Sequence, residues 1–230
     1  MATAAPWGMT TGPGAFMPMA EVDRLRLVQW LSPAFPVGSF AHSQGLETAI
    51  AKGVVHDAAS LADWIEGVLL FGSARQDAIF LLAARRGDAD LAALADLFDA
   101  YLPGPGRALE AAELGRAFGA QMAAIMGDDP PALPYPLAIG LALRGLAVTD
   151  AEVLALWFQT LAAQLVSVAV RFMPLGQTAG QRLIAGLAPL IAQAASNCAA
   201  LTPDDLGTCS IGADMAGMAQ EWLDVRIFRS

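Results

Sequence analysis

Through most of this chain, apolar residues recur every three or four positions. The clearest stripe is Leu61, Trp64, Ile65, Val68 and Leu69, which is the spacing of one face of an α-helix. No segment alternates apolar and polar residues as a half-buried strand does. The pattern therefore predicts an all-α fold, a single-domain bundle of about nine or ten helices.

Prolines, glycines and polar caps set the expected helix boundaries. Ser43 and Ser60 each precede an apolar stripe, so each is expected to start a helix, the first over 44–52. Thr149 and Glu152 have the spacing of a capping box. The other expected helices cover 21–31, 74–86, 91–102, 107–127, 135–146, 150–172 and 177–199.

The composition is unusually apolar for a water-soluble monomer. Hydrophobic residues make up 56% and charged residues 15% of the chain. This fits either a membrane protein or a helical protein that covers much of its surface with partners. Residues 153–170 carry no charge, and 183–200 are interrupted by Pro189 and Asn197, but flanking basic clusters are missing. We favour a bundle whose central helix is apolar all round.

Charge and cysteine usage limit the remaining classes. The formal net charge of −9 excludes sequence-independent binding to nucleic acid, which needs clustered basic residues. Cys198 and Cys209 have no CxxC spacing, which indicates a reducing compartment. No basic segment precedes an apolar core near the start, so we expect a cytoplasmic protein. Residues 1–20 lack periodicity and are expected to be a flexible arm before a helical domain over 21–230.

Residues that carry chemistry are sparse. The chain has two histidines, and neither has a partner at the spacing of a metal motif. His42 with Glu47, or Cys198 with Cys209, leaves open a contact with a soft divalent ion, although packed side chains are the favoured interpretation. Ser43 beside His42 lacks an orienting acid. We therefore expect no enzyme, no resident metal and no cofactor.

The loop over 31–48 has more individual character than any helix. Pro33 and Pro36 fix their own φ angles, and Gly38 permits a backbone geometry that a side chain forbids, so these three are expected to form a rigid turn. Apolar residues in such a loop indicate that it packs against another part of a protein. They are Phe35, Val37 and Phe40.

A polar cluster is expected at the start of the helix over 177–199. Gln177 and Gln181 lie four positions apart and share a helix face, as do Thr178 and Arg182. The cluster is either a polar cap on the bundle or a binding face, and both interpretations stay open.

The final residues form an unusual tail. Phe228 lies between Arg226 and Arg229, and aromatic and arginine side chains are enriched at interface centres. The tail is therefore expected to dock on a protein surface.

Three ordered segments resemble the urease accessory protein F family (UreF). The first is SPAFPVGSFAHSQGLE over 32–47, the second is RFMPLGQTAGQ over 171–181, and the third is RIFRS over 226–230. The likeness spans residues 25–230. It implies an all-α homodimer that acts as a non-catalytic nickel-insertion chaperone. The implied partners are the nickel-carrying GTPase UreG, the scaffold UreD (also called UreH) and apo-urease, so that nickel binding is indirect.

The resemblance also indicates which residues bind partners. His42, Gln44 and Glu47 are expected to present a polar face near a partner, together with the polar cluster and the tail described above. The alternative function is direct activation of the partner GTPase by an arginine supplied in trans, with Arg182, Arg226 and Arg229 as candidates.

One stretch departs from the family pattern. The family usually reads DIASMRHETQY where this chain reads DMAGMAQEWLD over 214–224. Ala219 and Gln220 replace an Arg-His pair, and Asp224 replaces a tyrosine. The resemblance implies that the partner surface has changed here or that this region binds less tightly.

Overall fold

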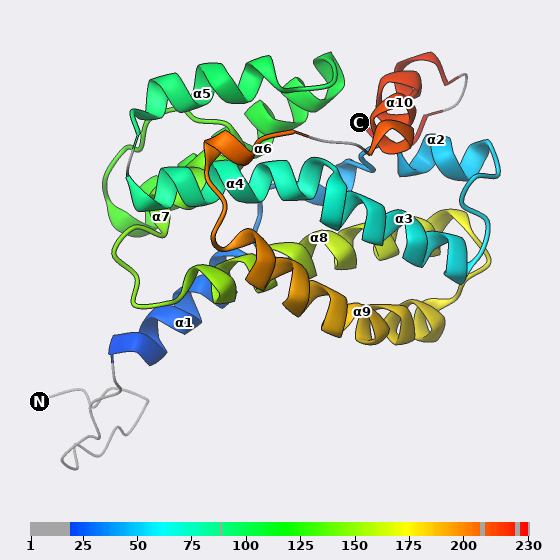
Figure 1. The fold of residues 1–230 in the computed structure, drawn as a ribbon, viewed down its shortest axis with the longest axis horizontal. Helices are drawn as coiled ribbons and strands as arrows, with labels where there is room; N and C mark the ends of the chain where they lie inside the picture. Colours follow the sequence, from blue (N-terminus) through cyan, green and yellow to red (C-terminus); the bar gives the residue numbers. More distant parts are fainter. Residues whose placement is uncertain (1–18, 88, 208–209, 224–225, 230) are drawn as a thin grey trace, which may run out of the picture.

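The computed structural model describes residues 19–87, 89–207, 210–223 and 226–229, and within them it is all-α, as predicted. Figure 1 shows α4 and α3 running across the middle of the bundle, α5 along one edge and α10 beside α2. The α-helices are α1 (Met19–Trp30), α2 (Leu46–Ala51), α3 (Ala58–Phe71), α4 (Ser73–Arg86), α5 (Leu91–Ala100), α6 (Pro105–Met126), α7 (Tyr135–Ala142), α8 (Asp150–Phe172), α9 (Gln177–Cys198) and α10 (Ile211–Ala219). Short 3-10 turns cover Ser39–Ala41, Pro203–Asp205 and Gln220–Trp222.

The expected helices are present, but two of the expected helix starts are wrong. The cap of α3 is Asp57, whose Oδ1 accepts the Ser60 backbone N–H at 2.8 Å, while Ser60 Oγ accepts the Asp57 N–H at 3.0 Å. Ser60 therefore closes the capping box from the third helical position. The cap of α2 is Gly45. Ser43 lies two residues earlier, where its hydroxyl donates to Gln220 at 2.9 Å and accepts only a long hydrogen bond, 3.5 Å, from the Glu47 N–H of α2.

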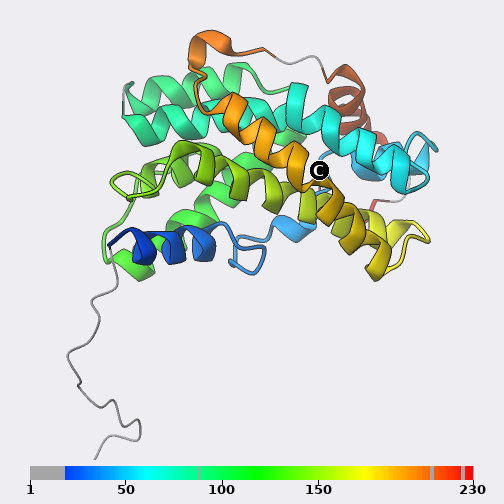
Figure 2. The ribbon, with the colours of Figure 1, turned by 60° about the horizontal axis from the view of Figure 1, so that its bottom comes forward.

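Helix α8 forms the centre of the bundle. It begins with the predicted capping box, in which Glu152 N–H donates to Thr149 Oγ1 at 3.2 Å and Thr149 N–H donates to Glu152 Oε2 at 2.8 Å. It packs against α9 and also contacts α2, α3 and α4. Figure 2 shows it inside the bundle, with α1 on one side and α9 on the other. A helix in this position is surrounded by apolar neighbours, which explains why its sequence carries so few charges.

Two stretches are long and apolar enough to cross a membrane by length and composition alone. They are Ala58–Arg86, which spans α3 and α4, and α8. In their most apolar windows, 72% and 56% of the residues are buried inside the protein. Core helices of a bundle pass the same test, so the finding is a weak indication of a membrane span.

Helix α7 crosses α4 with direct backbone contact at Gly140. A Cβ atom at Gly140 would lie 2.2 Å from the carbonyl oxygen of Leu81 and 2.9 Å from the Ala84 Cβ. We therefore expect Gly140→Ala to lower the free energy of unfolding by about 2–4 kcal/mol, because α7 must move away from α4. Urea denaturation measures this change.

Gly186, inside α9, is the matched control, because a Cβ there meets nothing within 4 Å. Gly186→Ala should leave stability unchanged or raise it by about 0.5–1 kcal/mol through the better helix propensity of alanine. Equal effects of the two substitutions would contradict the close approach of α7 and α4.

Candidate functional site

The loop between α1 and α2 packs on the bundle through two of its three apolar side chains. Phe35 and Val37 are buried, and the Phe35 ring lies 5.5 Å from the Phe118 ring of α6. Phe40 is 67% exposed, so the expectation that it packs inward is wrong. Its neighbours in the 3-10 turn carry the contact instead, because Gln164 Nε2 of α8 donates to the Ser39 carbonyl at 2.9 Å.

The same loop makes two left-handed turns. Gly38 has a φ of 84° before the 3-10 turn, while Pro33 and Pro36 lie exposed at the start of the loop. Gln44 and Gly45 then have φ values of 51° and 81°. Left-handed backbone is costly for most residues, so this pair fixes the direction in which α2 leaves the loop.

Glu47 of α2 holds the end of the chain. Its buried carboxylate accepts hydrogen bonds from the Ile227 backbone N–H at 2.8 Å, the Phe228 N–H at 3.2 Å and Gln220 Nε2 at 3.1 Å. Ser43 Oγ donates to Gln220 Oε1 at 2.9 Å. We call Ser43, Glu47, Gln220, Ile227 and Phe228 the tail-docking site. It joins segments from opposite ends of the described chain.

Phe228 and Arg229 pack onto the same surface. Phe228 is buried, and its ring lies 5.5 Å from the Phe172 ring at the end of α8. The Arg229 N–H donates to the Ala41 carbonyl at 2.7 Å, and its guanidinium pairs with Glu113 of α6 at 2.8 Å. Arg226 is exposed. The predicted docking tail therefore lies against its own chain.

The loop does not present the exposed polar face that we predicted. His42 and Glu47 are each 2% exposed, because the C-terminal segment covers Glu47 and the loop folds His42 inward. Burial lowers the pKa of His42, although Glu110 and Glu113 partly oppose that effect. Gln44 is half-buried and donates from Nε2 to Glu110 Oε1 at 2.9 Å. A role of these residues in partner binding stays a prediction.

The polar cluster of α9 lies on the surface. The side chains of Gln177, Thr178, Gln181 and Arg182 are all exposed. Gly180, on the opposite side of this turn, is buried, and a Cβ there would lie 3.0 Å from the Val166 side chain of α8. Helix α9 therefore packs against α8 at Gly180 and keeps these four polar side chains on the surface.

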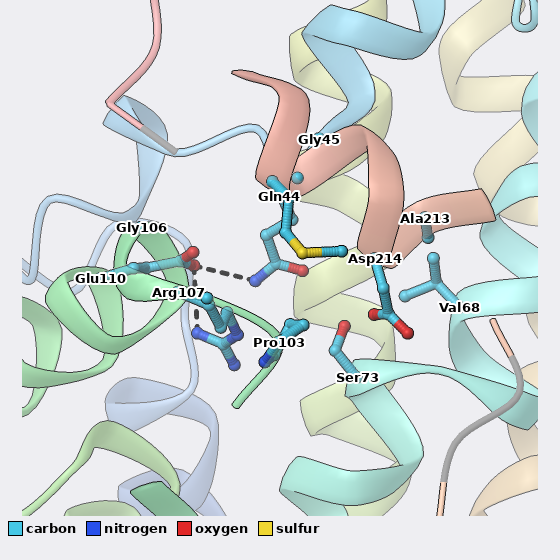
Figure 3. A pocket seen from close by; sticks show the side chains of 13 residues that line it. Gln44, Gly45, Val68, Ser73, Pro103, Gly106, Arg107, Glu110, Ala213 and Asp214 are labelled. Atoms are coloured by element: carbon cyan, nitrogen blue, oxygen red, sulfur yellow. Dashed lines mark hydrogen bonds and ion pairs between the residues drawn. The ribbon is translucent and has the colours of Figure 1, made fainter. Parts of the chain in front are cut away.

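A small pocket lies where α10 meets the starts of α2, α4 and α6 (Figure 3). In its wall, Arg107 forms ion pairs with Asp77 of α4 and with Glu110, the latter at 3.5 Å. Arg107 and Glu110 lie three positions apart on α6, at the spacing of an ion pair that is normally solvated. Both side chains are almost fully buried, because Asp77 supplies a second carboxylate for the guanidinium.

The sequence of this chain matches a known protein family. The model of the UreF family matches residues 55–188, which is more than half of the chain. The chain belongs to the UreF family. The match covers α3 to α8 and the first part of α9.

Relatives in this UreF family extend the match to nearly the whole chain. A protein named urease accessory protein UreF from Cereibacter sphaeroides (strain ATCC 17029) is 51% identical over 206 residues, 90% of this chain and 98% of the relative. Proteins of the same name from Jannaschia sp. (strain CCS1) and Paracoccus denitrificans are 44% and 45% identical, over 94% and 91% of this chain and 99% and 97% of their own length.

The departure of this UreF-family chain at Gln220 now has a structural explanation. Gln220 is 1% exposed, and its amide bridges the Ser43 hydroxyl and the Glu47 carboxylate. An amide both donates and accepts, so it satisfies both neighbours. Gln220, which stands where the family pattern has a histidine, therefore contacts its own chain. Ala219 ends α10, and Asp224 lies outside the described residues.

Metal-binding side chains are scattered in this UreF-family chain. Within the residues that the structure describes, no three His, Cys, Asp or Glu side chains gather in a geometry that would hold a metal ion. Cys198 is buried, and burial raises the pKa of its thiol, while Cys209 lies outside the described residues. The tail-docking site and the pocket are therefore built from hydrogen bonds, ion pairs and packing between distant segments of the chain.

Proposed function

We propose that this chain is a non-catalytic adaptor in the maturation of urease. It binds the accessory scaffold UreD/UreH and the nickel-carrying GTPase UreG, and it assists nickel incorporation into apo-urease. The observation that carries the proposal is the alignment with proteins named urease accessory protein UreF, at 51% identity over 90% of this chain. The adaptor works as a cytoplasmic homodimer, and nickel reaches urease through its partners.

The exposed start of α9 supports a role in partner binding. Gln181 and Arg182 are exposed side chains on the first turns of this helix, and Arg182 makes no ion pair within the described part of the chain. Long polar side chains that are not committed to their own protein are available to a partner, and arginine is a frequent interface hot spot.

Substitution of this face provides the test of partner binding. The double variant Gln181→Ala/Arg182→Ala should fold as the wild type does, because both side chains are exposed. We expect its affinity for the scaffold or the GTPase to fall about tenfold or more, as measured by titration calorimetry. The matched control is Gln193→Ala/Asn197→Ala, on an exposed part of the same helix. Equal affinities for all three proteins would contradict the assignment of this face.

The activity itself is tested on apo-urease at limiting nickel. With scaffold and GTPase present, nickel occupancy of urease should rise when this chain is added, and light scattering should report the mass of a dimer. Equal nickel occupancy with and without the chain would overturn the proposed function.

The alternative, direct activation of the GTPase by an arginine in trans, is favoured by the exposure of Arg182. Arg229 is less suited, because it already pairs with Glu113. An arginine entering a nucleotide site raises turnover by about 10³–10⁵. Single-turnover GTP hydrolysis at saturating Arg182→Ala and Arg226→Ala protein distinguishes the two functions, since both side chains are exposed. A full rate with both variants supports the adaptor, and a rate reduced on that scale with either supports direct activation.

A further inference from the structure

The pocket between α10 and the starts of α2, α4 and α6 has the size of a single charged group. Its cavity volume is about 50 Å³. A cavity needs roughly 10–15 Å³ to hold one water, so this one has room for a small group. An ammonium or guanidinium group fits this space.

Two hydrogen-bond acceptors line the cavity without donors. The Asp214 carboxylate of α10 makes no hydrogen bond or ion pair with the described residues. Gln44 Oε1 is buried and also has no partner among them. The orientation of Gln44 is fixed, because its Nε2 donates to the Glu110 carboxylate and its oxygen must then face away. Figure 3 shows the Asp214 and Gln44 side chains projecting into the same space.

Unpartnered acceptors of this kind are costly to bury. A buried polar atom that lacks a hydrogen bond destabilises the folded state by about 1–3 kcal/mol, because it has given up its hydrogen bonds to water. Partial burial also raises the pKa of Asp214, and no cation among the described residues opposes that shift. A ligand that carries donors only would satisfy both oxygens, and among side chains only lysine and arginine carry several donors and no acceptor.

The charges around the cavity favour a cation as well. Arg107 lies in the wall, but Asp77 and Glu110 already neutralise it. With Asp214, three carboxylates stand against one guanidinium. The net charge around the cavity is therefore negative, so an anion would be repelled and a cation attracted.

Apart from the Ser73 hydroxyl, the other side chains of the lining are apolar. Val68, Pro103 and Met218 surround the polar groups, and they can cover the methylene stem of a long side chain. We propose that this pocket receives the cationic tip of an arginine or lysine side chain from a protein partner, held by Asp214 and Gln44. This inference rests on the proposed function for the presence of a partner protein, but the pocket can be tested without one.

The first experiment uses ethylguanidinium as the probe on the full chain. In ¹H–¹⁵N correlation spectra, the amide signals of the lining residues Gly104, Gly106 and Gly217 should shift and saturate at millimolar probe. N-ethylurea, which is neutral and of the same shape, should not shift them. Asp214→Asn should abolish the response to ethylguanidinium. Equal shifts with both probes, or a response that survives Asp214→Asn, would overturn the cation site.

The second experiment asks whether the occupant belongs to a partner. Asp214→Asn should weaken binding to the scaffold or the GTPase about tenfold or more, because truncating one member of a desolvated charge pair leaves the other unpaired. Asp99→Asn, an exposed residue of α5, controls for the change in net charge. If Asp214→Asn and Asp99→Asn bind both partners as the wild type does, a partner side chain is not the occupant, although the proposed function stands. If the wild type binds neither partner, the proposed function fails, and the probe result still decides the cation site.

Discussion

Replacing Glu47 with alanine will release the C-terminal segment 226–229 while the helical bundle stays folded. The Glu47 carboxylate is the acceptor for the Ile227 N–H, the Phe228 N–H and the Gln220 side chain. Without it, these donors would remain buried and unpaired, at about 1–3 kcal/mol each, unless the segment moves into water. Phe228 and Arg229 also hold this segment, but it lies outside every helix, so we expect it to detach before the bundle unfolds.

Amide hydrogen exchange measures this release directly. We expect the protection of the Ile227 and Phe228 amides to fall about 100-fold, with little change in the midpoint of global unfolding. Glu47→Gln keeps the shape and one acceptor oxygen, so its effect should be intermediate. Glu66→Ala, on the exposed side of α3, is the control and should leave protection unchanged. Unchanged protection in Glu47→Ala would show that the tail-docking site contributes no stability.

Replacing Asp77 with asparagine will change how the stability of the fold varies with pH. Burial raises the pKa of Asp77 from 3.8 to about 6, although Arg107 opposes the shift. The folded state therefore keeps a proton that the unfolded state has released. The stability that this proton provides is complete below about pH 4 and is lost as the pH rises through about 6.

The expected size follows from the shift of about two pH units, which corresponds to about 3 kcal/mol. Asparagine does not titrate, so the stability of Asp77→Asn relative to the wild type should rise by about 3 kcal/mol between pH 4 and pH 7 and stay constant above. Urea denaturation at several pH values measures this difference. Asp99→Asn accounts for the loss of one charge at the surface. A difference that does not vary with pH would contradict the raised pKa of Asp77.

Features that depend on neighbouring residues were predictable from the sequence. The capping box of Thr149 and Glu152 and the start of α8 follow from positions three apart, and the structure confirms both. The Ser60 error has a local cause as well. A serine that closes a capping box looks like one that opens a helix, unless the aspartate three residues earlier is given priority.

Features that depend on distant residues were not predictable. Spacing along α6 shows that Arg107 and Glu110 share a face, but it does not show which way that face points. Their burial depends on Asp77, which is 30 positions from Arg107. Glu47 is a similar case, because a carboxylate in a short helix is normally solvated, and the backbone donors that it accepts lie in a tail with no periodic pattern.

The tail-docking site also has a kinetic consequence. Ser43 and Gln220 are 177 positions apart, so their contact closes a loop that includes almost every helix. The entropy lost in closing such a loop makes early formation unfavourable, and the surface for docking exists only after α2 and α8 have packed. This contact therefore forms late in folding, and its strength governs how fast the segment opens rather than how fast the bundle assembles.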